Sequence, residues 1–238
     1  MFRVIFFHPM NPVVPASFRV SLFLTSMALL GVANVSAADS TRSSTVAPGL
    51  SVTTPEPVLE PLFNGKDLTN FRAEGSKDFW RVENGILIGE NDSTLKGNYL
   101  WTTKEYSDFI LEFDVRWKGT SDRGVDTGIE MRKPKIQLQL GTSGSLKRDM
   151  SGSFYTAGKP GYPEVGQAKE ANTLMKPEGE WNTFRIRAKG DTFTCWINGQ
   201  KASEYTDAKF SGAAPLGLQI HPGVAMKCEF RNVKLAEH

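Results

Sequence analysis

The sequence has few of the residues that hold metals or form cross-links, with two cysteines and three histidines in 238 residues. The histidines are far apart in the chain, at His8, His221 and His238, and none stands at the spacing of a zinc site. A zinc cluster is therefore excluded and no cofactor is predicted. A structural calcium stays open, because oxygen ligands such as Asp122 or Asp126 leave weak sequence signatures.

The chain also lacks an apolar run long enough to span a membrane. The longest, VSLFLTSMALLGV at 20–32, is about thirteen residues, the length of a signal-peptide core. The small residues Val35 and Ala37 follow it, which predicts cleavage after Ala37 or Ala38. We therefore expect 1–38 to be a signal peptide and the mature protein to be periplasmic or secreted, without a membrane span. An uncleaved anchor is the alternative.

The chain without its leader also has no net excess of acidic or basic residues. Once Arg3 and Arg19 leave with the leader, 26 basic residues face 26 acidic ones. A neutral chain has no electrostatic footprint for nucleic acid, so we expect no such partner. Dinucleotide-binding motifs and β-α-β alternation are absent from the sequence, which excludes a doubly wound nucleotide-binding fold.

The mature chain divides into a spacer and one domain. Residues 39–58 are rich in Ser, Thr and Pro without a packing period, which predicts a flexible linker. Residues 59–238 are numerous enough for one well-packed domain. Cys195 and Cys228 both lie in strand-like runs. Two buried thiols are the favoured interpretation and a disulfide is the alternative.

Within the domain, short alternating runs predict an all-β fold. DFILEFDVRWKG at 108–119 alternates apolar and charged residues, and a Gly-Asp and an Asn-Gly turn join three strands between 184 and 205. About eleven strands are expected, with one short helix at 169–176. Such a pattern favours an antiparallel sandwich or barrel.

Polar side chains alternate with apolar ones in several of these strands. In DTGIEMRKPKIQLQL (126–140) and LGLQIH (216–221), the apolar residues share one face of each strand. The opposite faces carry amide, guanidinium, carboxyl and imidazole groups, from Glu130, Arg132, Gln137, Gln139, Gln219 and His221. A solvated sheet face and a binding face are both compatible with this pattern.

A long loop, GTSGSLKRDMSGSFYTAGKPGYP at 141–163, points to a binding face. It is rich in glycine and aromatic residues, and loops of this length are commonly functional. Amide and guanidinium groups suit sugar hydroxyls, and Tyr155, Tyr162 or Trp80 are candidates for stacking on a sugar. A carbohydrate is therefore the expected ligand, with Lys147 and Asp149 closing over it.

The motifs LFNGKDLTNF, DFILEFDVRWKG, DTGIEMR, EWNTFRIRAKGDTFTCWINGQ and GLQIH, in this order, resemble the 3-keto-disaccharide hydrolase domain family from about residue 61 to 235. The resemblance implies a concanavalin A-like antiparallel jelly-roll β-sandwich, and hydrolysis of glycosides whose sugar is oxidised at C3. The sequence departs from the family pattern at Thr127 and Gly128, at Lys135 in place of a Glu, and at Gly141 or Thr142 in place of an Asp.

The chemistry that the resemblance implies needs a base for the C2 proton and a donor for the enolate oxygen. His221 and Glu130 are the candidate bases, and histidine ordinarily exchanges its proton near neutral pH. Arg132 is the candidate enolate clamp because its planar fork fixes geometry. Substrate contacts are assigned to Gln137, Gln139, Gln219, Lys147, Asp149, Tyr155 and Arg231.

Simpler interpretations stay open for the same residues and for the whole domain. His221 is equally suited to a structural bond with a loop carbonyl, and Arg132 to an ion pair with Glu130. A carbohydrate-binding module without chemistry is the alternative function. An interaction domain for another secreted protein is a third, although the polar face lacks the aromatic and aliphatic residues that interface cores favour.

Overall fold

The computed structural model describes residues 55–118 and 124–238. The expected leader, most of the expected linker and Asp122 lie outside the described residues. Within them the chain forms fourteen strands, paired antiparallel throughout. The prediction of an all-β antiparallel fold is confirmed.

The first sheet has eight strands in the order β12-β11-β10-β5-β14-β3-β2, with β1 paired to β14. Its strands are β1 (Glu60–Pro61), β2 (Trp80–Glu83), β3 (Ile86–Glu90), β5 (Phe109–Trp117), β10 (Asn182–Lys189), β11 (Thr192–Ile197), β12 (Gln200–Thr206) and β14 (Lys227–Glu237).

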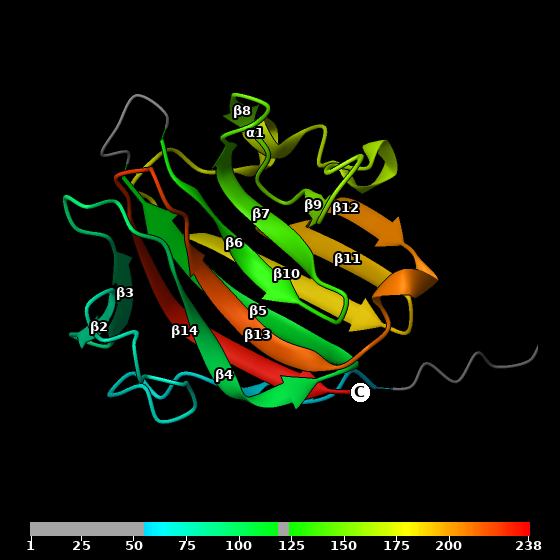
Figure 1. Cartoon of the computed structure of the whole chain (residues 1–238). Coiled ribbons are helices and arrows are strands. Elements are labelled where there is room, and N and C mark those ends of the chain that lie inside the picture. Colours follow the sequence, from blue (N-terminus) through cyan, green and yellow to red (C-terminus); the bar gives the residue numbers. More distant parts are fainter. Residues whose placement is uncertain (1–54, 119–123) are drawn as a thin grey trace, which may run out of the picture. The chain divides into compact units, whose positions relative to one another are not determined.

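The second sheet has six strands in the order β4-β13-β6-β7-β8, with β9 paired to β7. Its strands are β4 (Asn98–Tyr106), β6 (Asp126–Met131), β7 (Ile136–Ser143), β8 (Arg148–Asp149), β9 (Phe154–Thr156) and β13 (Ala214–Ile220). In Figure 1 this sheet lies in front of β10, β5 and β14. The connections contain the helical segments η1 (Glu164–Gly166), α1 (Ala171–Leu174) and η2 (Ala208–Phe210), and α1 confirms the helix predicted at 169–176.

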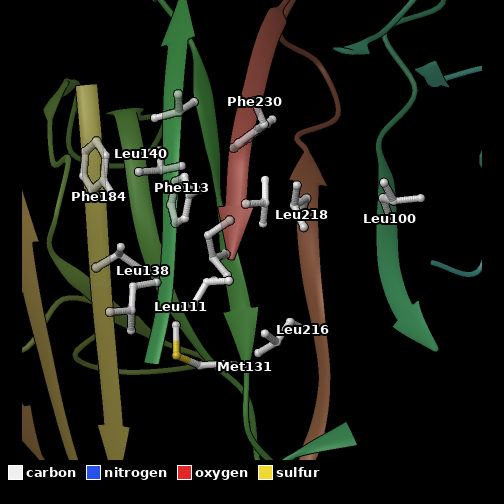
Figure 2. Close-up of a cluster of buried hydrophobic side chains, with 14 of the residues drawn as sticks. Leu100, Leu111, Phe113, Met131, Leu138, Leu140, Phe184, Leu216, Leu218 and Phe230 are labelled. Atoms are coloured by element: carbon white, nitrogen blue, oxygen red, sulfur yellow. The ribbon is translucent and has the colours of Figure 1, made fainter. Parts of the chain in front are cut away.

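The two sheets pack face to face through their apolar sides. Figure 2 shows Phe113, Phe184 and Phe230 of the first sheet in one cluster with Met131 and Leu138 of the second. None of the five is more than 1% exposed. The Phe113 ring stacks on Phe184 with centroids 5.8 Å apart, so strand alternation produces the sandwich core.

Asn-Gly turns close two hairpins, and the one at 198–199 lies where the sequence predicts it. Asn84-Gly85 joins β2 to β3 and Asn198-Gly199 joins β11 to β12, and all four residues have positive φ, between 49° and 82°. That conformation is the one that two-residue hairpins require, and Asn-Gly adopts it readily. The two-residue strands β1 and β8 and the three-residue β9 are too short to show a period, which explains why fewer strands were expected.

Both cysteines are free and fully buried, so the prediction of two buried thiols is confirmed. Burial raises the pKa of the Cys195 thiol above its ordinary value, and raises that of Cys228 to about 12. Thiolate is the reactive form of cysteine, and burial in apolar surroundings disfavours it.

We therefore expect neither thiol to react with dithionitrobenzoate in the native protein at pH 8. Both should react once guanidinium unfolds the chain, and the absorbance of the released chromophore measures each stage. Labelling of either thiol in the native state, without loss of structure, would contradict the buried placement.

Candidate functional site

The polar side of the second sheet carries a row of residues that face one another across five strands. Trp101 of β4 faces Gly217 of β13, and Gly217 faces Glu130 of β6. Glu130 faces Gln137 of β7, which in turn faces Tyr155 of β9. Directly opposed residues lie about 5 Å apart, so the strand registers gather side chains from distant parts of the sequence.

Two glycines leave space for large side chains to lie across this face. A Cβ atom on Gly217 would lie 2.5 Å from the Trp101 ring, and one on Gly128 would lie 2.3 Å from Nε2 of Gln137. The Trp101 ring stacks on Tyr99 with centroids 4.9 Å apart and an interplanar angle of 19°. The result is a flat aromatic surface beside a flat amide group.

Three glutamines form a connected hydrogen-bond network at the centre of the face. Gln137 Nε2 donates to Gln139 Oε1 (3.2 Å) and to Gln219 Oε1 (3.1 Å). Gln139 Nε2 donates to Asp126 Oδ1 (2.8 Å), and Gln219 Nε2 donates to the Tyr99 hydroxyl (2.7 Å). All three glutamines are at most 8% exposed. A solvated face would expose them, so that alternative is wrong for this part of the sheet.

Glu130 stands at one edge of the network as a buried carboxylate. It is 8% exposed and accepts a hydrogen bond from Lys135 Nζ at 3.1 Å. Burial, with the charge and hydrogen bond of Glu130, raises the pKa of Tyr99 above its ordinary value. The Tyr99 hydroxyl therefore stays protonated, accepting from Gln219 and donating to Glu130.

Two tyrosines of the long loop complete the face on its other side. Tyr162 donates from its hydroxyl to Gln139 Oε1 at 3.0 Å, and its ring lies 5.0 Å from that of Tyr155. Burial is the main cause that raises the pKa of Tyr162 to about 12. The loop thus covers the amide network, which explains why these glutamines are buried on the outer side of a sheet.

The polar face contains two neighbouring recesses. The first recess has a volume of about 350 Å³ and is lined by Tyr99, Asp126, Lys135, the three glutamines, Ser143, Gly144, Ser145, Tyr155, Tyr162 and His221. The second recess, also about 350 Å³, is lined by Arg72, Trp101, Glu130, Arg132, Lys133, Lys135, Ala214 and Pro215. Lys135 lines both, so the Glu130–Lys135 ion pair marks the border between them.

Five of the predicted site residues line the first recess: Gln137, Gln139, Gln219, Tyr155 and His221. Nδ1 of His221 lies 2.7 Å from the Pro222 carbonyl oxygen. A carbonyl only accepts, so Nδ1 carries a hydrogen in this arrangement. His221 therefore makes the structural bond to a loop carbonyl, and it also lines the first recess.

The placement predicted for Arg132 is wrong. Its φ of +66° takes the chain out of β6, and although Arg132 lines the second recess, its side chain is fully buried. The guanidinium donates to the Asp108 carboxylate (3.1 Å) and the Ser107 hydroxyl (3.0 Å), and to the carbonyls of Gly190 and Ser211. It cannot clamp a ligand in the first recess. Its ion-pair partner is Asp108 and not Glu130.

Arg231 and Trp80 are also misplaced by the sequence analysis, because both belong to the first sheet. Arg231 binds Asp114 Oδ2 at 3.1 Å and lies 4.2 Å from the centre of the Trp181 ring. Trp80 is 2% exposed and packs in the core against Phe230. Neither side chain lines the two recesses.

Lys147 and Asp149 lie beside the first recess rather than over it. They line a separate pocket of about 430 Å³ that shares Asp126, Ser143 and Gly144 with the first recess. Their closure over a ligand in the first recess stays a prediction.

Sequence reasoning missed Tyr99 and Trp101, which build the aromatic surface. Their signal is the alternation of NYLWTT at 98–103, where Leu100 and Thr102 point into the core and the two rings point outward. Asp126, a candidate calcium ligand from the sequence, accepts with its two oxygens from Gln139 and from the Gly144 backbone N–H (2.8 Å each). Among residues 55–118 and 124–238, no group of three or more His, Cys, Asp or Glu is placed to hold a metal.

The layered fold and its recessed polar face define a concanavalin A-like jelly-roll sandwich, as predicted. The chain belongs to the family of 3-keto-alpha-glucoside-1,2-lyase-like domains, whose model matches residues 59–236. No curated protein matches the chain significantly.

Solved structures share the fold at low sequence identity. Two described as "putative glycosyl hydrolase", both from Parabacteroides distasonis ATCC 8503, superpose with TM-scores of 0.55 and 0.53 at 22% and 19% identity. Each covers 76% of this chain, and the matches span 100% and 94% of those chains. The carbohydrate recognition domain of Emp47p superposes with a TM-score of 0.52 at 14% identity, over 75% of this chain and 94% of that one. In the part of the chain that the structure describes, no helix is long and apolar enough to cross a membrane.

The contacts of Arg132 predict a structural role that can be tested. Arg132→Gln removes a buried cation, so Asp108 loses its ion-pair partner and the carbonyls of Gly190 and Ser211 lose a donor. We expect a loss of about 3 kcal/mol in the free energy of unfolding. Urea denaturation measures this. Lys104→Gln, which breaks the exposed pair with Glu237, is the control and should cost under about 1 kcal/mol. Unchanged stability in Arg132→Gln would refute the structural role.

Proposed function

We propose that this protein cleaves glycosides whose sugar carries a ketone at C3. In this proposal it removes the C2 proton, eliminates the aglycone and adds water. The observation that carries the proposal is the Glu130 carboxylate, buried at the border of two recesses and hydrogen-bonded to Lys135. Family membership supports it, because the family is named for a lyase acting on 3-keto-glucosides.

The sugar ring occupies the first recess and the aglycone the second. The amide network and Tyr99 supply donors and acceptors for hydroxyl groups, and Trp101 supplies a flat face next to the border. Lys135 lines both recesses, so the bond that breaks lies beside it. This division places C1 and the adjacent C2 near the Glu130–Lys135 pair.

In the first step the Glu130 carboxylate takes the C2 proton, and the electron pair of that C–H bond forms the enolate on the C3 oxygen. As the C3 carbonyl re-forms, a C1=C2 double bond appears and the C1–O bond breaks. The departing oxygen takes a proton from the Lys135 ammonium. One base and one acid at the border are sufficient for this step.

The enolate oxygen needs a hydrogen-bond donor, and Arg132 lies too far inside the fold to provide it. Gln219 Nε2 gives one hydrogen to Tyr99, and its second hydrogen is the donor that we assign to the enolate. Nε2 of His221 accepts a bond from a sugar hydroxyl. A donor fixed in place before the reaction stabilises developing charge without reorganisation.

Water then adds across the double bond. Its oxygen bonds to C1 while Lys135, now a neutral amine, takes one of its protons. The protonated Glu130 returns its proton to C2. Both side chains regain their starting states, and the net reaction is hydrolysis.

Glu130→Gln tests this assignment. The amide cannot accept the C2 proton, so we expect kcat on a phenyl 3-keto-glucoside to fall by about 10² to 10⁴, measured as phenol release. Glu164→Gln removes an exposed carboxylate and serves as the control with unchanged turnover. His221→Ala distinguishes the two candidate bases. If kcat falls by this amount in His221→Ala and is unchanged in Glu130→Gln, His221 is the base and the assignment to Glu130 is wrong.

A carbohydrate-binding module without chemistry is the second candidate function. The departures from the family pattern favour it, since Lys135 stands where the family commonly has a Glu, and Gly141 or Thr142 where it commonly has an Asp. The wild-type domain distinguishes the two when it is incubated with 3-keto-glucosides and with their unoxidised parents. Binding of both sets by calorimetry, with no product by chromatography, would establish the binding module and refute the enzyme.

We also propose a periplasmic or secreted location, because the sequence of 1–38 has the features of a signal peptide. Expression of the whole chain in a bacterium should yield a mature protein beginning at Ala38 or Asp39, determined by N-terminal sequencing of the exported fraction. Recovery of the uncut chain in the membrane fraction would favour the anchor instead.

A further inference from the structure

The second recess has more positively charged side chains than the proposed reaction requires, since that reaction uses only Lys135. Its lining has three exposed cations, Arg72, Lys133 and Lys135, and one acid, Glu130. Arg132 also contributes to the lining, but its guanidinium is wholly buried and paired with Asp108. Only the three exposed side chains are therefore available to a ligand.

Ion pairing leaves two of these cations unneutralised. Glu130 is held by Lys135 at 3.1 Å and by Tyr99. Among residues 55–118 and 124–238, neither Arg72 nor Lys133 has a carboxylate within ion-pairing distance. Two cations without counter-charges that line one open recess attract an anionic group.

Backbone hydrogen bonds anchor the main chain of both residues beside this recess. The Arg72 N–H donates to the Trp101 carbonyl oxygen at 2.8 Å. Lys133 exchanges two backbone hydrogen bonds with Gly212, at 2.9 and 3.1 Å, and a Cβ on Gly212 would lie 2.4 Å from the Lys133 oxygen. These bonds fix the positions from which the two side chains reach the recess.

We propose that the second recess binds an anionic aglycone, a ring that packs against Trp101 and carries a carboxylate or sulfate group held by Arg72 and Lys133. This inference rests on the proposed function, because it needs the sugar in the first recess. It adds a substrate class: the protein acts on acidic glycosides in preference to neutral ones. Charge-assisted hydrogen bonds from a guanidinium and an ammonium provide the recognition.

The test uses matched substrates that differ in charge. The 4-carboxyphenyl and 4-carbamoylphenyl 3-keto-glucosides, in both anomers, have similar shape and similar leaving groups, but only the first is anionic. We expect the kcat/KM ratio of carboxylate to carboxamide to be about ten. It should fall toward one in about 0.5 M salt, because exposed charges are screened there. The 4-sulfooxyphenyl 3-keto-glucoside forms a second arm, which shows whether carboxylate or sulfate is preferred.

The double variant Arg72→Gln, Lys133→Gln should bring the ratio close to one. Lys189→Gln, Lys234→Gln is the matched control, since it removes two exposed cations from the first sheet and should keep the ratio near ten. A wild-type ratio near one, or a ratio that survives in the Arg72, Lys133 variant, would overturn the proposal.

Calorimetry with the unoxidised 4-carboxyphenyl and 4-carbamoylphenyl glucosides measures binding without the reaction. It distinguishes failure of the anionic-aglycone proposal from failure of the proposed hydrolysis. If no 3-keto-glucoside is cleaved but the carboxylate still binds about tenfold more tightly, the reaction is wrong and the anionic recess stands. If cleavage proceeds without any charge preference, the reaction stands and the anionic recess is wrong.

Discussion

The antiparallel register of β6, β7 and β13 is the constraint on which the rest of the molecule depends. Because side chains alternate across a strand, one register places Ile129, Leu138 and Leu218 in the core and turns Glu130 and Gln137 outward. A shift by one residue would exchange the two sets. The same pairing therefore holds the two sheets together and assembles the polar face.

The polar face is a network in which the parts fix one another. Gln137 uses both hydrogens of Nε2 for the other two glutamines, which in turn bond Asp126 and Tyr99. Each amide thus has one orientation that satisfies its neighbours, and buried polar groups are stable only when satisfied. A ligand meets donors and acceptors whose directions are already set, which limits the entropy lost on binding.

The positions of the arginines show how backbone geometry overrides a sequence pattern. Arg132 stands two residues after Glu130 and continues its alternation in sequence, but the positive φ at Arg132 ends the strand there. Its guanidinium enters the interior, where Asp108 and three other oxygen acceptors surround it. Arg231 alternates correctly within β14, but β14 belongs to the other sheet. Alternation assigns a face within one strand and says nothing about which sheet the strand joins.

The sequence by itself determined the longer strands, the Asn-Gly turn at 198–199 and the apolar side of each of these strands, because these depend on neighbours a few residues apart. It also indicated that Gln137, Gln139, Gln219 and His221 lie on the polar faces of their strands. Only the tertiary structure decided that Tyr99 and Trp101 lie beside them, that Lys135 pairs with Glu130, and that the long loop covers the face. These features depend on strand order and register between segments up to about a hundred residues apart, and periodicity along one strand carries no information about its partners.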